Sequence, residues 1–196
     1  MTDAYIDFLE ELFPAISPYT AQRAKDAVRE FSRYGSKAPF FAEPLDEEFQ
    51  QGDIFSKVPF VYVDKEGQGQ LAVLGGMLLT NSCDIVRNDN LQFAAMTPID
   101  EYSRDGAKQE AVRSNENYEY LYFPDTRIDN QFVNFGLITS ISRTAFEKFV
   151  EDGHSERIAS LSSIGYFLFI TKLTVFFMRP EDSDVYASRK KAISTP

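Results

Sequence analysis

Residues 71–80 are the stretch that most restricts how this chain can fold. Apolar side chains fill nearly every position up to Leu79, and Gly75-Gly76 interrupts the run. Such continuous apolar character is typical of a strand that is buried on both faces or that crosses a small barrel. The glycine pair predicts a bend, because residues without a β-carbon accept the backbone angles of a bulge at low cost. Polar residues begin abruptly at Thr80.

The loop that follows this strand, residues 81–90, separates it from a second strand predicted over residues 91–99. Apolar or alternating patterns predict further strands over residues 51–63, 118–123 and 131–141, and helices over residues 107–113, 144–151 and 166–177. The last helix is apolar on most of its circumference, which is typical of a helix inside a core. The chain therefore predicts an α+β protein, with a small, mostly antiparallel barrel or strongly bent sheet and a buried C-terminal helix.

Two helical patterns precede the strands. In residues 3–13 apolar side chains recur at helical spacing until Pro14. A second pattern begins at Pro18 and ends at Gly35. We expect a helical hairpin packed on the main domain, and the alternative is an amphipathic arm that binds a partner. The predicted organisation is a hairpin over residues 1–35, a connector over 36–51, a main domain over 52–180 with a polar insertion at 100–117 and a C-terminal helix at 163–179, and a flexible tail over 181–196.

Charge and cysteine content limit the classes of function. The 196 residues include 30 acidic against 20 basic ones, and the net charge of -10 disfavours general binding to nucleic acid. Cys83 is the single cysteine, so an internal disulfide framework and a cysteine-rich zinc site are excluded. A reducing compartment fits this composition best.

Targeting and membrane signals are not expected from the sequence. The first residues lack the basic and then apolar pattern of a secretory signal. The longest apolar stretch, residues 164–178, contains Lys172 and is shorter than the ~20 residues that span a bilayer. We therefore expect a cytoplasmic protein without membrane contact.

The polar loop after the first apolar strand is the strongest candidate for a binding site. Side chains that project from a loop on a buried strand are well placed to contact a ligand. The alternative is a turn that simply contains many turn-forming residues. The candidate binding residues are Thr80, Asn81, Ser82, Asp84 and Arg87.

Cys83 and Asp84 are the two neighbouring residues of this loop whose side chains could take part in catalysis. A catalytic thiol needs a base or a positive field, whereas a neighbouring carboxylate raises its pKa. We therefore expect Cys83 to be a buried small residue, and Asp84 to accept backbone hydrogen bonds that fix the loop. A catalytic pair of Cys83 with His154, the single histidine, is the less favoured alternative.

Bound metal ions and cofactors are not expected. Asn88, Asp89 and Asn90 lack the further spaced ligands and the closing glutamate of a calcium loop. The glycines of residues 67–76 lack the following lysine and the helix start of a phosphate-binding loop.

Tyr118, Tyr120 and Tyr122 lie on one face of the strand predicted over residues 118–123. This face is either half-buried sheet surface or a contact surface, since tyrosine offers a large area and a hydroxyl at low entropic cost.

The order of several short motifs resembles the MazF/PemK family of small-barrel toxins. The match covers roughly residues 52–145 and is carried by Gly52-Asp53-Ile54, Met77-Leu78-Leu79-Thr80, Phe93-Ala94-Ala95-Met96-Thr97-Pro98-Ile99 and the segment 133–141. Residues Thr80-Asn81-Ser82-Cys83-Asp84-Ile85 further resemble a T-Q-S/T-C-D-I/L signature of uncharacterised bacterial proteins associated with this barrel, with Asn81 in place of glutamine. The resemblance implies a MazF/PemK-like barrel with additional helices before and after it.

The same resemblance implies that the ribonuclease residues of the toxins are missing. Toxin members carry an arginine near the position of Leu74 and a threonine or serine at the position of Asp100, and these residues serve RNA cleavage. An aspartate at this position would repel the scissile phosphate. If the chain is an enzyme, Cys83, Asp84 and Asp100 are the candidate catalytic residues.

We expect from this comparison a non-catalytic binding or regulatory module of a bacterial toxin-like or defence-type system. Its expected partners are proteins, and a homodimer is one possible assembly. The alternative is an enzyme, either endoribonuclease-like or dependent on Cys83, with its site in residues 80–90.

Overall fold

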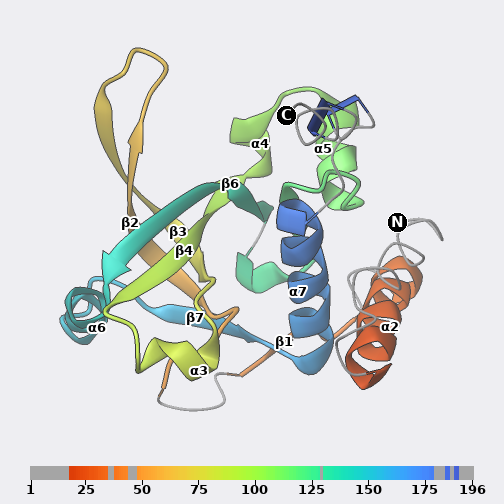
Figure 1. Ribbon diagram of the computed structural model, residues 1–196, viewed down its shortest axis with the longest axis horizontal. Coiled ribbons are helices and arrows are strands. Elements are labelled where there is room, and N and C mark those ends of the chain that lie inside the picture. The colour runs from red at the N-terminus through yellow and green to blue at the C-terminus, as the bar shows by residue number, and fades with distance from the viewer. Residues whose placement is uncertain are drawn as a thin grey trace, which may run out of the picture.

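The computed structural model describes residues 18–34, 38–43, 48–128, 130–178, 184–185 and 188–189. Within these ranges the chain forms an α+β fold built on one seven-stranded antiparallel sheet with the order β1-β7-β2-β3-β4-β6-β5 (Figure 1). The strands are β1 (Phe41–Ala42), β2 (Ile54–Val63), β3 (Gly69–Leu78), β4 (Asn90–Pro98), β5 (Tyr120–Tyr122), β6 (Gln131–Ser142) and β7 (Arg157–Leu161). The helices are α2 (Pro18–Tyr34), α3 (Ser82–Ile85), α4 (Ile99–Tyr102), α5 (Gly106–Arg113), the 3-10 turn η2 (Thr126–Ile128), α6 (Arg143–Glu151) and α7 (Ser163–Met178).

The sheet is open, because β1 and β5 form its two edges. It is nevertheless strongly curved, since β2 also contacts β6, which lies three strands away in the order. Register shifts in β2 between Phe55 and Val58, and in β6 between Asn134 and Ile138 opposite Ala95 and Ala94 of β4, provide the bulges for this curvature. The α+β class and the antiparallel sheet are confirmed, whereas a closed barrel is not observed.

Buried side chains cover both faces of the central sheet. The largest core cluster lies under α7 and α2, a second lies under α6, and a small third cluster contains Ile99, Val112 and Phe132. Neighbouring residues of β3 supply the first two clusters, with Met77 in the first and Leu78 in the second. Phenylalanine dominates the second cluster, where the rings of Phe55 and Phe146 meet edge to face with centroids 5.0 Å apart.

The predicted C-terminal helix is confirmed as a core element. In α7, Leu168, Phe169 and Val175 are buried, and α2 packs along the other side of this helix (Figure 1). α2 is the second helix of the predicted N-terminal hairpin, and Ala27 and Val28 on it are buried. The first predicted helix lies outside the described residues, as does most of the predicted tail.

The prediction that the whole of residues 71–80 is buried on both faces is wrong for its first half. Leu71 is 69% exposed and Val73 is 54% exposed. The reason is that β3 pairs with β4 only at residues 76–78, so its beginning leaves the sheet together with the end of β2. A strand that is buried in the sheet and a strand that extends beyond it can have the same apolar pattern. The pattern alone therefore cannot distinguish them.

The polar insertion at residues 100–117 is folded and is tied to the core by a buried lysine. The predicted helix is present as α5, and Lys172 of α7 donates hydrogen bonds to the carbonyl oxygens of Asn115 at 2.9 Å and Asn117 at 2.5 Å. The Asn115 side chain in turn pairs with the backbone N–H and carbonyl of Tyr122, at 2.8 and 2.9 Å. Burial lowers the pKa of the Lys172 ammonium to about 7.

In the described part of the chain, α7 and the other helices are all too short or too polar to cross a bilayer.

Candidate functional site

The candidate loop folds into the short helix α3 at one end of the sheet (Figure 1). Asn81 caps this helix, because its side-chain oxygen accepts a hydrogen bond from the Cys83 backbone N–H at 3.0 Å. Ile85 anchors the helix in the core, whereas Ser82 and Cys83 are exposed. The sequence departs here from the glutamine of the resembling signature, and asparagine is the better cap.

Gln51 connects α3 to the end of β3 and to α7. Its backbone N–H donates to Ser82 Oγ at 2.9 Å, and its side-chain Nε2 donates to the Leu79 carbonyl at 2.8 Å. Its Oε1 accepts a hydrogen bond from the Tyr166 hydroxyl at 3.2 Å. Three segments that are distant in sequence therefore meet at one corner of the molecule, which we call the α3 corner: Gln51, residues 79–87 and Tyr166.

Burial and Cys83 both affect the ionisation of Tyr166. Burial raises the pKa of the Tyr166 hydroxyl, and a negative charge on Cys83 would raise this pKa further. The hydroxyl therefore stays protonated at neutral pH and acts as the donor to Gln51. A neutral phenol supplies no positive field that would activate a neighbouring thiol.

Asp53 holds the turn that carries Gln51. Its buried carboxylate accepts hydrogen bonds from the Gln50 N–H at 2.8 Å, from Arg157 Nη1 at 3.0 Å and from Ser160 Oγ at 2.6 Å. Arg157 and Ser160 belong to β7, so the carboxylate joins this strand to the beginning of β2. Gly52 completes the turn, since it has a φ of +91° and a β-carbon there would collide with the Leu161 side chain.

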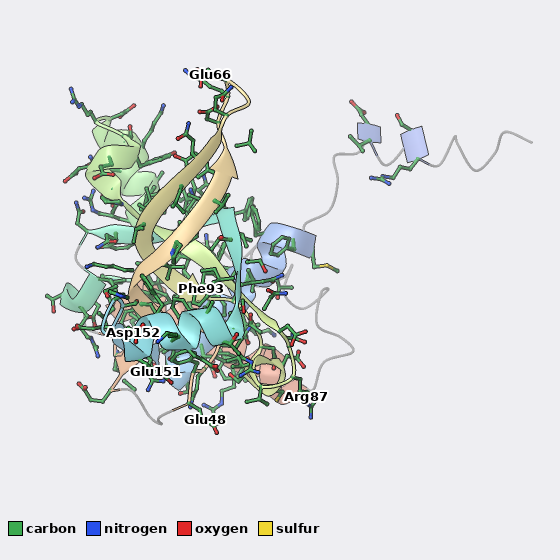
Figure 2. All side chains as sticks on the ribbon, turned by 90° about the vertical axis from the view of Figure 1, so that its left-hand side faces the viewer. Glu48, Glu66, Arg87, Phe93, Glu151 and Asp152 are labelled. Atoms are coloured by element: carbon green, nitrogen blue, oxygen red, sulfur yellow. The ribbon has the colours of Figure 1, made fainter. Side chains whose placement is uncertain are left out.

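The predicted binding residues of the loop divide into buried and exposed groups. Thr80 is buried, and its hydroxyl accepts a hydrogen bond from the Gln92 N–H at 2.8 Å, so its role is structural. Asn81, Ser82 and Arg87 are exposed, and Asp84 is half-buried. Figure 2 shows Arg87 at the end of the molecule that lies farthest from Glu66 in that view.

The expected roles of Cys83 and Asp84 are both corrected by the structure. Cys83 is exposed, because it lies in the first turn of a short surface helix. The Asp84 carboxylate accepts no hydrogen bond from any described residue, and it is instead the Asp84 backbone carbonyl that accepts bonds from Arg87 and Asn88 at 3.1 and 2.9 Å. The side chain that fixes the loop is therefore Asn81.

The other candidate residues lie away from this corner. Asp100 is in α4, at the opposite end of β4 from α3 (Figure 1), where it accepts hydrogen bonds from Gln109 and Asn130. His154 packs its ring against Phe149 at the end of α6, with centroids 5.3 Å apart. Among the described residues no hydrogen bond joins His154 to Cys83, and no group of three acidic, cysteine or histidine residues has the geometry to hold a metal ion.

The tyrosine face of β5 is partly buried. The Tyr120 ring packs against Phe132 and Tyr102, with centroids 4.7 and 5.1 Å apart, whereas Tyr118 before the strand is exposed. Burial and the Tyr102 hydroxyl raise the pKa of Tyr120 far above its usual range. The face therefore packs mainly against its own domain.

Sequence reasoning missed Gln51 and Tyr166 of the α3 corner, and Asp53, which holds the turn that carries Gln51, because tertiary contacts give these residues their roles. The available signal was the motif Gln51-Gly52-Asp53, in which a carboxylate follows a turn glycine at the start of a strand. Arg157, the partner of Asp53, lies in β7, and this strand was not predicted as a strand.

These features define an α+β protein with an open antiparallel sheet and an exposed polar corner. Gln51 holds this corner through hydrogen bonds with Ser82, Leu79 and Tyr166. No family model matches the chain, and neither a curated protein nor a solved structure matches it.

Proposed function

We propose that the protein is a non-catalytic binding module that docks a protein partner at the α3 corner. The setting implied by the resemblance to MazF/PemK toxins is a bacterial toxin-like or defence-type system. The contact residues are Asn81, Ser82, Asp84 and Arg87 of the loop, while Thr80 supports them from below.

A single observation carries this proposal: Gln51 fixes the base of the corner through three hydrogen bonds, while the outward side chains remain available. Polar groups held on a rigid support lose little entropy when a partner binds them. Ser82 keeps its hydroxyl proton as a donor, since it accepts rather than donates in its bond with Gln51.

The surroundings of Cys83 and Asp84 favour binding over catalysis. Within the described residues neither side chain forms a hydrogen bond or an ion pair with a lysine, arginine or histidine. A nucleophilic thiol or a general acid needs such a partner to shift its pKa. The net charge of -10 also disfavours RNA as the bound molecule.

Site-specific photocrosslinking in the organism that carries the protein tests this proposal. A benzophenone amino acid in place of Arg87 is expected to give a discrete protein adduct, and the additional change Ser82→Arg is expected to reduce its yield severalfold. The matched control is the same photocrosslinker in place of Lys108, an exposed cation on α5 at the other end of β4. Equal adducts from both positions, or an adduct that ribonuclease removes, would contradict a protein-binding corner.

The second candidate function is an enzyme whose site is the same loop, and the exposure of Cys83 is the observation that favours it. Such an enzyme would act either on RNA or through the thiol. Both versions require a cation near the reacting group, and among the described residues none is hydrogen-bonded or ion-paired to Cys83 or Asp84.

A further inference from the structure

Beyond the central sheet, the ends of β2 and β3 form a two-stranded arm over residues 57–74 (Figure 1). Pairing of β2 with β7 ends at Phe55, and pairing of β3 with β4 begins only at Gly76. Among the described residues the arm therefore has no paired strand on either side. Figure 2 shows Glu66 at its tip, projecting from the body of the molecule.

The inner face of the arm is held by the rest of the chain. Val58 and Phe60 lie on this face, are fully buried and belong to the core cluster under α6. At the tip, the Asp64 carboxylate accepts hydrogen bonds from the Glu66 N–H at 3.0 Å and from the Gln70 side chain at 2.6 Å. Packing at the base and this turn at the tip therefore give the outer face a rigid support.

The outer face of the arm is apolar and exposed. Val61 pairs with Leu71 across the two strands, so their side chains lie on the same face. Four large apolar side chains of this face are more than half exposed: Val61 at 67%, Val63 at 70%, Leu71 at 69% and Val73 at 54%. Contiguous exposed apolar patches are rare on monomeric proteins and mark interaction sites.

Lysines lie at both ends of this apolar row. Lys57 and Lys65 are each four positions from Val61, so the alternation of the strand places them on the outer face as well. The Lys57 side chain forms neither a hydrogen bond nor an ion pair with a described residue. Lys65 Nζ lies 3.6 Å from a Glu66 carboxylate oxygen, but both side chains are mostly exposed, so solvent weakens this pair. The charges on the outer face are therefore both positive, although the whole chain has a net charge of -10.

We propose that the outer face of the arm binds a segment of a partner protein whose apolar side chains are flanked at both ends by carboxylates. The apolar side chains of the partner cover Val61, Leu71 and their neighbours, and its carboxylates pair with Lys57 and Lys65. The eight residue steps between the lysines correspond to about 27 Å of strand. An extended segment of about nine residues, or a helix of about 18 residues, reaches both lysines.

The same charges disfavour other occupants of this face. A second copy related by a two-fold axis at Val61 would set Lys57 of one arm against Lys65 of the other, so that like charges meet at both ends. An anionic membrane or a nucleic acid would be repelled by the net charge of -10 and by the acidic residues of the tip. A carboxylate-flanked protein segment is therefore the partner that this face fits best. The inference does not depend on the function proposed for the α3 corner, since Figure 2 shows Glu66 and Arg87 at opposite ends of the molecule.

Selection of displayed peptides on the purified full chain tests the proposal. The library holds random peptides of about 18 residues, which are long enough to reach both lysines. Enriched peptides are expected to have an apolar centre with Asp or Glu in both flanks. Synthetic copies of them are expected to bind Val61→Asp about tenfold more weakly or worse, because a carboxylate then lies in the apolar row. Met178→Asp, at a methionine of α7 that is 61% exposed, is the matched control and is expected to bind as the wild type does. An absence of enriched peptides, or equal binding to Val61→Asp and wild type, would overturn the proposal.

Charge reversal tests the role of the two lysines in variants that keep the apolar side chains. The double variant Lys57→Glu, Lys65→Glu is expected to bind the acid-flanked peptides about tenfold more weakly and to select peptides with basic flanks instead. Lys108→Glu, at an exposed site on α5, is expected to keep the wild-type affinity. Enriched peptides without acidic flanks, or equal affinities for the double variant and wild type, would rule out this recognition. Dimers of the full chain, or binding to anionic vesicles, that Val61→Asp abolishes would also overturn it, because the face would then have another occupant.

Discussion

Replacing Asp53 by alanine is expected to lower the free energy of unfolding by about 3–5 kcal/mol. The change removes the acceptor of three hydrogen bonds, one of them from the Arg157 guanidinium, whose side chain is only 14% exposed. Removing one partner of a buried charged pair costs more than the pair itself contributes, because the remaining donors lose their acceptor in a poorly solvated site. Urea unfolding of the full chain, followed by circular dichroism, measures the effect.

Two further variants separate the buried pair from ordinary ion pairing. Asp53→Asn keeps an acceptor for the Gln50 N–H, so an intermediate loss is expected. Glu147→Gln breaks the more exposed pair with Arg143, where the charged atoms lie 3.0 Å apart on α6, and it is expected to cost less than about 1 kcal/mol. Equal losses for Asp53→Ala and Glu147→Gln would contradict a structural role for Asp53 in holding the turn at Gln51.

Replacing Lys172 by methionine is expected to remove most of the increase in stability that the wild type shows between about pH 7 and pH 9. Burial lowers the pKa of Lys172 in the folded protein to about 7, against an ordinary value of 10.5. Between these two values the unfolded chain binds a proton at this lysine that the folded chain does not bind. The wild-type free energy of unfolding therefore rises with pH, by up to about 1.4 kcal/mol per pH unit.

Urea unfolding over this pH range measures the slope for wild type and variant. Below about pH 7 the lysine is protonated in both states, so no slope is expected from it there. Methionine also removes the Lys172 hydrogen bonds to the Asn115 and Asn117 carbonyls, of which Asn117 keeps the Tyr120 N–H as a donor, so a loss of about 1–3 kcal/mol at the upper end of the range is expected. Lys108→Met, at an exposed site on α5, should keep the wild-type slope. An equal slope in wild type and Lys172→Met would contradict the lowered pKa.

The spacing of apolar residues predicted the longer helices and strands, because each of them buries one face, or all faces, and its apolar residues therefore recur regularly. α7 is predicted by apolar residues at helical spacing, and β4 and β6 by runs that end at turn residues. β1 and α3 were missed because two and four residues are too few to define a period. β7 was missed since it is a short mixed strand whose position is set by pairing with β2.

The first half of β3 shows what an apolar sequence pattern cannot predict. Leu71 and Val73 have the same character as Met77 and Leu78, yet the first two are exposed and the last two are buried. The difference arises from where the neighbouring strands end, which depends on contacts between distant segments. A sequence pattern indicates that a side chain favours burial, but it does not show whether the folded chain buries that side chain.

The α3 corner was predicted in part for a related reason. The position of the loop after the buried strand, and the exposure of its polar side chains, depend on neighbouring residues in the sequence. They could therefore be predicted from the sequence. Gln51 and Tyr166 lie 115 positions apart, and only the fold brings them together. The exposure of Cys83 and the capping role of Asn81 depend on a single turn of helix that has no pattern of its own.

Incubation of the purified full chain with a mixed pool of RNA, with the ends of the products sequenced, tests most directly whether the α3 corner binds without catalysis. The account predicts no cleavage above that of a Cys83→Ser, Asp100→Asn double variant, because among the described residues neither side chain is hydrogen-bonded or ion-paired to a lysine, arginine or histidine. Specific cleavage by the wild type that is lost on replacing Asp84, Arg87 or Asp100 would contradict it.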